Sequence, residues 1–152
     1  SAGPGPRMWD LGKAGMALPL ICYEAVFAQD VSAAPQRPAV ILQITNDAWF
    51  GKFSGPYQHL AQARMRAIEQ GVPLIRAANT GVSAVIDGRG TVVAQLKLGV
   101  AGYLDADLPG ILPATPYSRS SDWPWVVLMA LGLSGLFMQQ RRQRFKARRI
   151  ND

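Results

Sequence analysis

Runs of apolar residues recur along the first two thirds of the chain, each ended by glycine, proline or polar positions. The run over residues 16–21 is short and predicts a buried strand. The run over residues 39–44 is continuous and rich in branched side chains, which is typical of a central strand buried on both faces. Further strands are predicted over residues 72–77, 82–87, 91–96 and 102–106, with a turn at residues 87–90.

Two helices are predicted between these strands, one over residues 23–32 and one over residues 57–70. In the second helix, apolar side chains at three- and four-residue spacing share one face: Leu60, Ala61, Met65 and Ile68. Gly71 suits the C-terminal end of that helix, and Pro73 prevents its continuation. The single histidine, His59, lies near its start, where a structural or capping role is favoured over a catalytic one.

The C-terminal part has a different composition. Residues 123–138 carry no charge, and a helix of these 16 residues covers about 24 Å, short of the roughly 30 Å of a bilayer's hydrocarbon core. Trp123 and Trp125 suit one membrane interface, and arginines beyond the stretch can snorkel to the other. We therefore expect a transmembrane helix over residues 123–140. The alternative is a buried helix of a soluble core, which would rarely be followed by six cations in nine residues.

Those cations also predict an orientation, because positive residues are retained in the cytoplasm. The basic tail over residues 141–152 would then be cytoplasmic, and the preceding part would lie in the periplasm of a bacterium with an outer membrane. The N-terminus has no charged segment followed by an apolar one, so no signal peptide is predicted. Because the chain also begins without methionine, we expect a piece of a longer protein.

Composition narrows the classes of function. The chain has 152 residues, of which 49% are apolar, which suits one modest globular domain. We predict a catalytic part over residues 1–108 and a proline-rich connector over residues 109–122, followed by the helix and the tail.

The formal charge of +6 belongs mainly to the tail, since residues 1–140 hold ten basic and nine acidic residues. No nucleic-acid partner is therefore expected. One cysteine excludes an internal disulfide, and with one histidine we predict neither a metal site nor a cofactor.

The only cysteine, Cys22, stands where the first predicted strand meets the first predicted helix. Backbone N–H groups and the positive end of a helix favour a thiolate at such a turn, which makes Cys22 a candidate nucleophile. The alternative is a buried structural cysteine, since free cysteines are among the most buried residues.

Four stretches together resemble the nitrilase, or carbon–nitrogen hydrolase, superfamily. They are LICYE at residues 20–24, TNDAWFG at 45–51, ARMRAIE at 63–69 preceded by Gln58 and His59, and RAANTGVS at 76–83. With a membrane segment predicted after them, the set is most similar to the apolipoprotein N-acyltransferase family of bacteria, over about residues 20–142. The resemblance implies an α/β fold, namely the C-terminal portion of a nitrilase-like α/β/β/α sandwich followed by one transmembrane helix.

The resemblance implies that Cys22 is the catalytic nucleophile. Its neighbour Tyr23 shapes the site or simply packs, and the Tyr23 backbone N–H is a plausible donor to an oxyanion. Glu24 is a candidate for hydrogen bonding within the turn or to a substrate amine. The alternative for Glu24 is a carboxylate that interacts with the helix dipole.

A second group of candidates follows the strand predicted at residues 39–44. Asn46 and Asp47 either contribute to the site or make an Asx turn. Trp49 and Phe50 either line an acyl or peptide pocket or cover the core. These polar and aromatic residues would stand at a sheet edge, where sites are commonly built.

The reaction that the resemblance implies is acyl transfer in two steps. The Cys22 thiolate takes an acyl chain from a phospholipid as a thioester, and the α-amine of a diacylglyceryl apolipoprotein then takes the chain from Cys22. The family also uses a glutamate base and a lysine that stabilises the oxyanion, both upstream of the cysteine. Here no glutamate precedes Cys22 and the only preceding lysine, Lys13, does not match by position, so we expect both outside this chain.

Two other functions remain open at this point. A nitrilase-type amidase would use the same cysteine on a small amide, and it would not need the apolar C-terminal segment. A membrane-tethered remnant without catalysis would account for the unmatched base and lysine.

Overall fold

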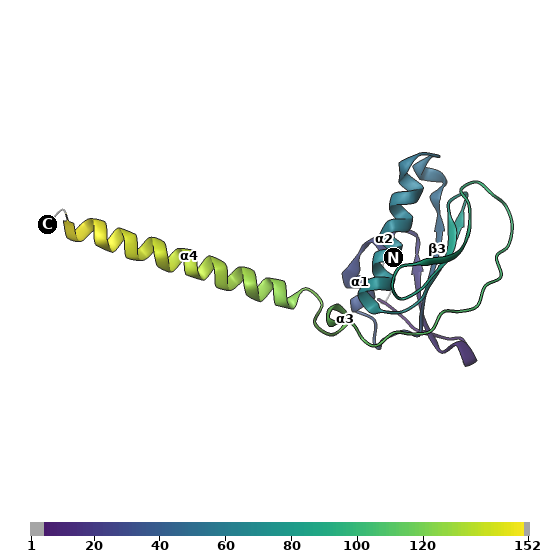
Figure 1. The fold of residues 1–152 in the computed structure, drawn as a ribbon, viewed down its shortest axis with the longest axis horizontal. Coiled ribbons are helices and arrows are strands. Elements are labelled where there is room, and N and C mark those ends of the chain that lie inside the picture. The colour runs from purple at the N-terminus through teal and green to yellow at the C-terminus, as the bar shows by residue number, and fades with distance from the viewer. Residues whose placement is uncertain (1–4, 151–152) are drawn as a thin grey trace. The chain divides into compact units, whose positions relative to one another are not determined.

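The computed structural model describes residues 5–150. The part up to residue 119 is built on a mixed six-stranded sheet (Figure 1). The strands are β1 (Trp9–Asp10), β2 (Met16–Ile21), β3 (Val40–Asn46), β4 (Leu74–Asn79), β5 (Ser83–Ile86) and β6 (Val92–Leu96), and they lie in the sheet in chain order. Strands β2, β3 and β4 are parallel, whereas β1, β5 and β6 each pair antiparallel with their neighbours. The carboxyl ends of the three parallel strands therefore meet at one edge, which is where ligand sites of α/β sheets commonly lie.

Helices lie between the first four strands and after the last strand. The 3₁₀ helices are η1 (Gly12–Ala14), η2 (Cys22–Val26) and η3 (Asp47–Phe50), and the α-helices are α1 (Ala28–Ser32), α2 (Ser54–Gln70), α3 (Pro116–Ser120) and α4 (Trp123–Ile150). Helix α2 ends as the sequence predicts, because Gly71 adopts the left-handed conformation at φ 64° and its N–H bonds back to the last turn.

Two local predictions were wrong. The helix expected over residues 23–32 is divided into η2 and α1, since Phe27 between them is extended (φ −93°, ψ 109°). The strand expected over residues 102–106 is absent, and these residues have no regular secondary structure. Most of them are exposed, with 87% of Tyr103 accessible, so no buried face holds this segment against the sheet.

The core lies between one face of the sheet and the helices α1 and α2 (Figure 1). Its strand residues include Leu18, Leu20, Ile41, Leu74 and Ile86, and helix α2 contributes Leu60, Ala63 and Ala67. The opposite face of the central strands is also apolar but only partly covered: Ile21 is 54% exposed and Ile44 is 51% exposed. The prediction that residues 39–44 are buried on both faces therefore holds for the face of Ile41 and Gln43, whereas the other face of β3 is buried at Val40 and exposed at Ile44.

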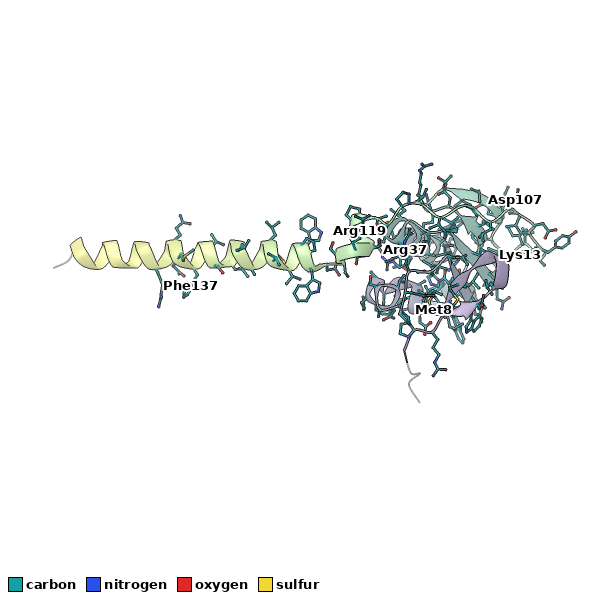
Figure 2. The ribbon with its side chains drawn as sticks, turned by 90° about the horizontal axis from the view of Figure 1, so that it is seen from below. Met8, Lys13, Arg37, Asp107, Arg119 and Phe137 are labelled. Atoms are coloured by element: carbon teal, nitrogen blue, oxygen red, sulfur yellow. The ribbon has the colours of Figure 1, made fainter. Side chains whose placement is uncertain are left out.

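Residues 1–119 and 120–152 form two separate compact units. The second unit is dominated by α4, whose side chains from Trp123 to Arg141 are exposed; Figure 2 shows them projecting from the helix around Phe137. In the part of the chain that the structure describes, no helix combines the length and the hydropathy needed to cross a membrane. The transmembrane helix expected over residues 123–140 is therefore not found, and the polar Gln139, Gln140 and Arg141 follow only 16 uncharged residues. Residues 1–4 and 151–152 of the predicted catalytic part and tail lie outside the described residues.

Candidate active site

Cys22 lies immediately after β2, as the first residue of η2, and is partly exposed with a free thiol. Its backbone is left-handed, with φ 52°. That conformation costs a residue with a side chain about 1–2 kcal/mol, so the surrounding structure must hold it in place. A strained strand-to-helix turn that presents a nucleophile is known from other acyl-transfer enzymes, and the geometry here is of that kind.

The two residues after Cys22 shape the turn. The Ile21 N–H donates to Glu24 Oε2 at 2.7 Å, so the carboxylate closes the turn around the cysteine. The Tyr23 ring contacts Phe27 edge-on, with centroids 5.7 Å apart, and lies 6.0 Å from the His59 ring. Both Tyr23 and Glu24 remain exposed, and their roles toward a substrate stay predictions.

Asn46 and Asp47, which begin the loop after β3, have different environments. Asn46 Oδ1 accepts from the Ala48 N–H at 3.1 Å, which is the Asx turn that the sequence left open. Asp47 is instead completely buried, and its Oδ2 accepts from Arg76 Nη2 at 2.5 Å. Because a buried charge without a partner is strongly destabilising, each of these two groups depends on the other.

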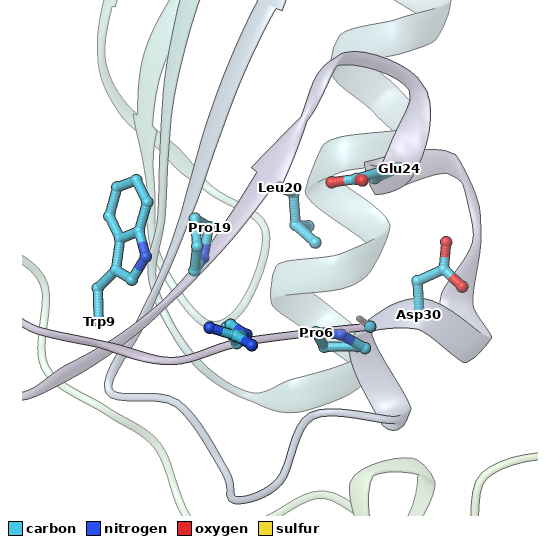
Figure 3. Close-up of a pocket in the computed structure, with 8 residues that line it drawn as sticks. Pro6, Trp9, Pro19, Leu20, Glu24 and Asp30 are labelled. Carbon is cyan, nitrogen blue, oxygen red and sulfur yellow. The ribbon is translucent and has the colours of Figure 1, made fainter. Parts of the chain in front are cut away.

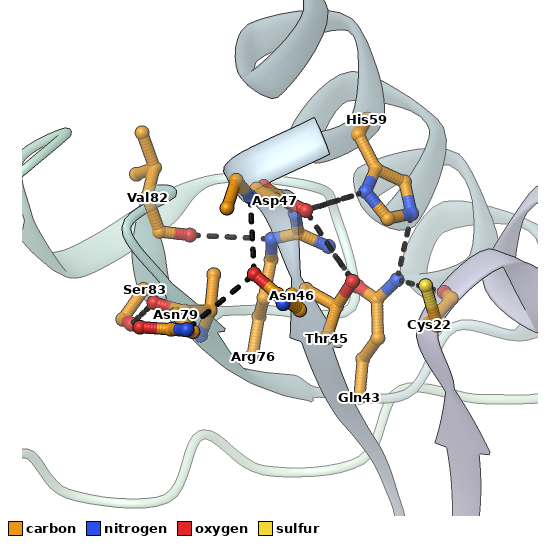
Figure 4. A network of polar contacts seen from close by, with 12 residues as sticks. Cys22, Gln43, Thr45, Asn46, Asp47, His59, Arg76, Asn79, Val82 and Ser83 are labelled. Atoms are coloured by element: carbon orange, nitrogen blue, oxygen red, sulfur yellow. Dashed lines mark hydrogen bonds and ion pairs between the residues drawn. The ribbon is translucent and has the colours of Figure 1, made fainter. Parts of the chain in front are cut away.

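Arg76 reaches this pair from β4. Burial lowers the pKa of its guanidinium below the ordinary value, while the charge and the hydrogen bond of Asp47, and more weakly the charge of Cys22, raise it in part. The same side chain donates from Nε to the Val82 carbonyl at 3.2 Å and from Nη1 to Gln43 Oε1 at 2.5 Å. One guanidinium therefore joins the loop after β3, the residue before β5 and the interior of β3 (Figure 4).

The network continues to the nucleophile through Gln43 and His59 (Figure 4). His59 is 2% exposed, and its Nδ1 lies 2.9 Å from Asp47 Oδ1. Its Nε2 lies 3.2 Å from Gln43 Nε2, and the same amide nitrogen donates to the Cys22 carbonyl at 3.0 Å. His59 is thus part of a buried structural network, in agreement with the role that its sequence position favoured.

The two aromatic residues of the loop after β3, Trp49 and Phe50, have different environments. Phe50 packs edge-on against His59, with ring centroids 5.4 Å apart, and so helps to enclose the network. Trp49 is 83% exposed and does not cover the core. The pocket-lining role predicted for both residues remains a prediction.

The sequence alone indicates no site role for Gln43, Thr45 or Arg76. Gln43 and Arg76 are neighbours in the register of β3 and β4, and Thr45 donates to Asp47 at 3.3 Å. Each is a polar residue inside an apolar strand, which is a signal visible in the sequence, but the register that brings them together is not.

A separate hollow of about 620 Å³ adjoins the turn (Figure 3). Pro19 and Leu20 of β2 line it together with Trp9, Glu24 and Asp30. Glu24 is the residue that it shares with the cysteine turn. In the described part of the chain, no three His, Cys, Asp or Glu side chains converge on a metal position.

Comparison with known proteins identifies chains with similar sequences. The carbon–nitrogen hydrolase family matches residues 6–112. Apolipoprotein N-acyltransferase of Rhodopseudomonas palustris is 54% identical over 132 residues, covering 87% of this chain and 25% of that protein. The Bradyrhizobium diazoefficiens protein of the same name is 60% identical over 117 residues, covering 77% of this chain and 22% of that protein. The chain therefore spans about a quarter of the length of these relatives.

Solved structures agree at the level of fold. Saccharomyces cerevisiae Nit3, a member of the nitrilase superfamily, superposes with a TM-score of 0.56 at 24% identity, covering 65% of this chain and 39% of that one. The NitN amidase from Neterenkonia sp. AN1 superposes with a TM-score of 0.50 at 25% identity, covering 64% of this chain and 40% of that one.

Proposed function

Because this chain belongs to the carbon–nitrogen hydrolase family and is highly similar to part of several apolipoprotein N-acyltransferases, we propose that it carries the nucleophile of such an acyltransferase. The observation that carries the proposal is the left-handed Cys22 at the end of β2, held by buried groups from β3 and α2. A buried structural cysteine would need neither the strained backbone nor the partial exposure.

The proposed donor is a phospholipid, and the first step transfers its acyl chain to the protein. The Cys22 thiolate attacks the ester carbonyl, the C–S bond forms, and the C–O bond to the glycerol breaks. The lysophospholipid leaves with a proton, and the acyl chain remains on Cys22 as a thioester.

The proposed acceptor is the α-amine of a diacylglyceryl apolipoprotein. The amine attacks the thioester carbonyl, the C–S bond breaks, and the amine proton returns to the Cys22 sulfur. The product is an N-acylated lipoprotein. No residue of this chain matches the glutamate base and the lysine of the resembled family, so we assign the proton transfers to no residue here.

The site of action follows from the substrates, which both reside in lipid. We propose that the acyltransferase works at the periplasmic face of the bacterial inner membrane. The exposed apolar side chains of α4, from Val126 to Met138, suit contact with lipid.

The proposal is tested by acyl capture. The chain, joined to the part of the Rhodopseudomonas palustris relative that it does not cover, is reconstituted in lipid with a phospholipid that carries an isotope-labelled acyl chain. Cys22 is then examined by mass spectrometry. We expect a mass increase on Cys22 equal to the labelled acyl group, removable by neutral hydroxylamine and absent from Cys22→Ala. Transfer of the label to a lipopeptide with a free diacylglyceryl-cysteine amine tests the second step.

Two outcomes would contradict the proposal. A folded protein that gains no acyl group on Cys22 in lipid does not perform the first step. A protein that instead hydrolyses small amides through Cys22, without taking acyl chains from phospholipid, would be an amidase.

A further inference from the structure

Gln43 is buried in the centre of the sheet, with 1% of its surface exposed, yet it contacts the backbone of the nucleophile. Its Nε2 lies 3.0 Å from the Cys22 carbonyl oxygen, and the two residues are 21 positions apart in the chain. A buried amide must satisfy all its hydrogen bonds, so its orientation is determined by its neighbours.

The neighbours of Gln43 permit one orientation. Arg76 Nη1 lies 2.5 Å from Gln43 Oε1, and a guanidinium only donates, so this atom must be the amide oxygen. The two N–H groups on Gln43 Nε2 then donate one hydrogen bond to the Cys22 carbonyl and one to His59 Nε2. His59 therefore accepts at Nε2 and carries its proton on Nδ1, from which it donates to Asp47 Oδ1. The ion pair of Asp47 and Arg76 thereby determines which group donates and which accepts in each hydrogen bond from Asp47 through His59 and Gln43 to Cys22.

The direction of the Cys22 carbonyl determines where the next N–H points. No cis peptide occurs among the described residues, and in a trans peptide the C=O and the following N–H point in opposite directions. Since Gln43 draws the Cys22 carbonyl into the core, the Tyr23 N–H points away from the core. It belongs to the first turn of η2, where N–H groups have no acceptor within the helix.

We infer that Gln43 is a positioning residue for the oxyanion donor of the Cys22 site. It holds the Cys22 carbonyl inward, and the Tyr23 N–H is thereby directed at the carbonyl oxygen of an acyl group bound to Cys22. Negative charge develops on that oxygen when a thiolate or an amine attacks the carbonyl, and a fixed backbone donor stabilises it. The inference rests on the proposed function only in taking Cys22 as an acyl-accepting nucleophile, and it holds for any acyl donor.

The test compares two reactions at Cys22 in the full chain. Acylation by p-nitrophenyl acetate passes through an oxyanion, whereas alkylation by iodoacetamide displaces iodide and forms none. The variant Gln43→Glu keeps the side-chain volume and an oxygen facing Arg76, but an ionised carboxylate cannot donate to the Cys22 carbonyl. We expect Gln43→Glu to slow acylation about tenfold or more, while alkylation stays within about threefold of wild type; removing an oxyanion donor outright costs roughly 10²–10³ in rate.

The controls separate positioning from folding. Gln95→Glu makes the same chemical change on an exposed position of β6 and should leave both rates unchanged. Gln43→Met removes the amide altogether without adding a charge, and it should reproduce the selective loss of acylation.

Each result is decisive. Selective loss of acylation in Gln43→Glu and Gln43→Met supports the inference. Equal changes in both reactions, or unchanged acylation in either variant, overturn it. Failure of phospholipid to acylate wild-type Cys22 contradicts the proposed function alone, because p-nitrophenyl acetate tests Gln43 independently of the lipid substrate.

Discussion

Two neighbouring rows on the same buried face of the sheet have opposite chemistry. Leu18, Ile41, Leu74 and Ile86 lie side by side across β2 to β5, and two residues further along the parallel strands the row is Leu20, Gln43, Arg76 and Ala84. The first row gains stability from burial alone, which is non-directional and tolerates changes of shape. The second row contains groups that are costly to bury and must be satisfied by specific partners. The apolar row thus stabilises the fold, whereas the polar row determines the orientation of the side chains and of the Cys22 carbonyl. The polar row lies toward the end of the strands where the cysteine turn begins.

The largest effect is expected from breaking the ion pair of the polar row. Asp47→Ala leaves the Arg76 guanidinium buried without its partner, and we expect the free energy of unfolding to fall by about 3–5 kcal/mol in urea titration. The double variant Asp47→Leu with Arg76→Met should recover most of this loss, because a well-packed apolar pair replaces a buried ion pair at little cost. A single variant that loses less than about 1 kcal/mol would show that the pair is not buried in solution.

A smaller effect is expected from crowding the same carboxylate. A Cβ added to Gly81 would collide with Asp47 Oδ2 and lie 2.7 Å from Asp47 Cγ, so Gly81→Ala should cost about 1–3 kcal/mol as the carboxylate is displaced. Gly110→Ala is the matched control, because nothing lies within 4 Å of its added Cβ. If the cost of Gly81→Ala stays the same in an Asp47→Ala background, the strain does not act through the carboxylate.

The apolar row should respond weakly and without effect on chemistry. Ile41→Val removes one buried methylene, and we expect a loss of about 0.5–1.5 kcal/mol in urea titration. The rates of Cys22 acylation and alkylation should not change. A selective loss of acylation in Ile41→Val would show that the apolar row also affects the chemistry at Cys22, contrary to this prediction.

The smallest effect on stability is expected at the rim of the turn. Glu24→Gln replaces an ionised acceptor of the Ile21 N–H by a neutral one, which should lower the free energy of unfolding by about 0.5 kcal/mol because the bond is exposed. Thermal unfolding measures the change. Large loss of acyl transfer to the amine acceptor at this small cost would indicate that Glu24 contacts the substrate, as its sequence position suggests.

The sequence predicted the parts of the fold that depend on local pattern. Strands β2 to β6, helix α2 and its end at Gly71 follow from apolar runs and chain breakers, and the turn at Cys22 follows from the end of the first run. The strand expected at 102–106 failed because most of these residues are exposed and no buried face holds them against the sheet. The membrane span failed because the uncharged stretch ends before it is long enough.

The network beneath Cys22 could not be predicted for a different reason. Gln43 and Arg76 are 33 residues apart, and Asp47 and Arg76 are 29 apart, so their contacts depend on the register of parallel strands. His59 could be placed near a helix start but not on the face that meets β3. A polar residue inside an apolar strand can be recognised in the sequence as a candidate for a buried hydrogen bond. Its hydrogen-bond partner becomes known only when the register of the strands is known.

The length of chain that the network spans has a consequence for biosynthesis. The geometry at Cys22 requires Gln43, His59, Asp47 and Arg76, and the carbonyl of Val82 completes the set. A growing polypeptide that has translated only its cysteine segment carries a thiol without this scaffold. The nucleophile therefore acquires its arrangement only after about sixty further residues have been made and the strands have docked, which delays reactivity until the sheet is complete.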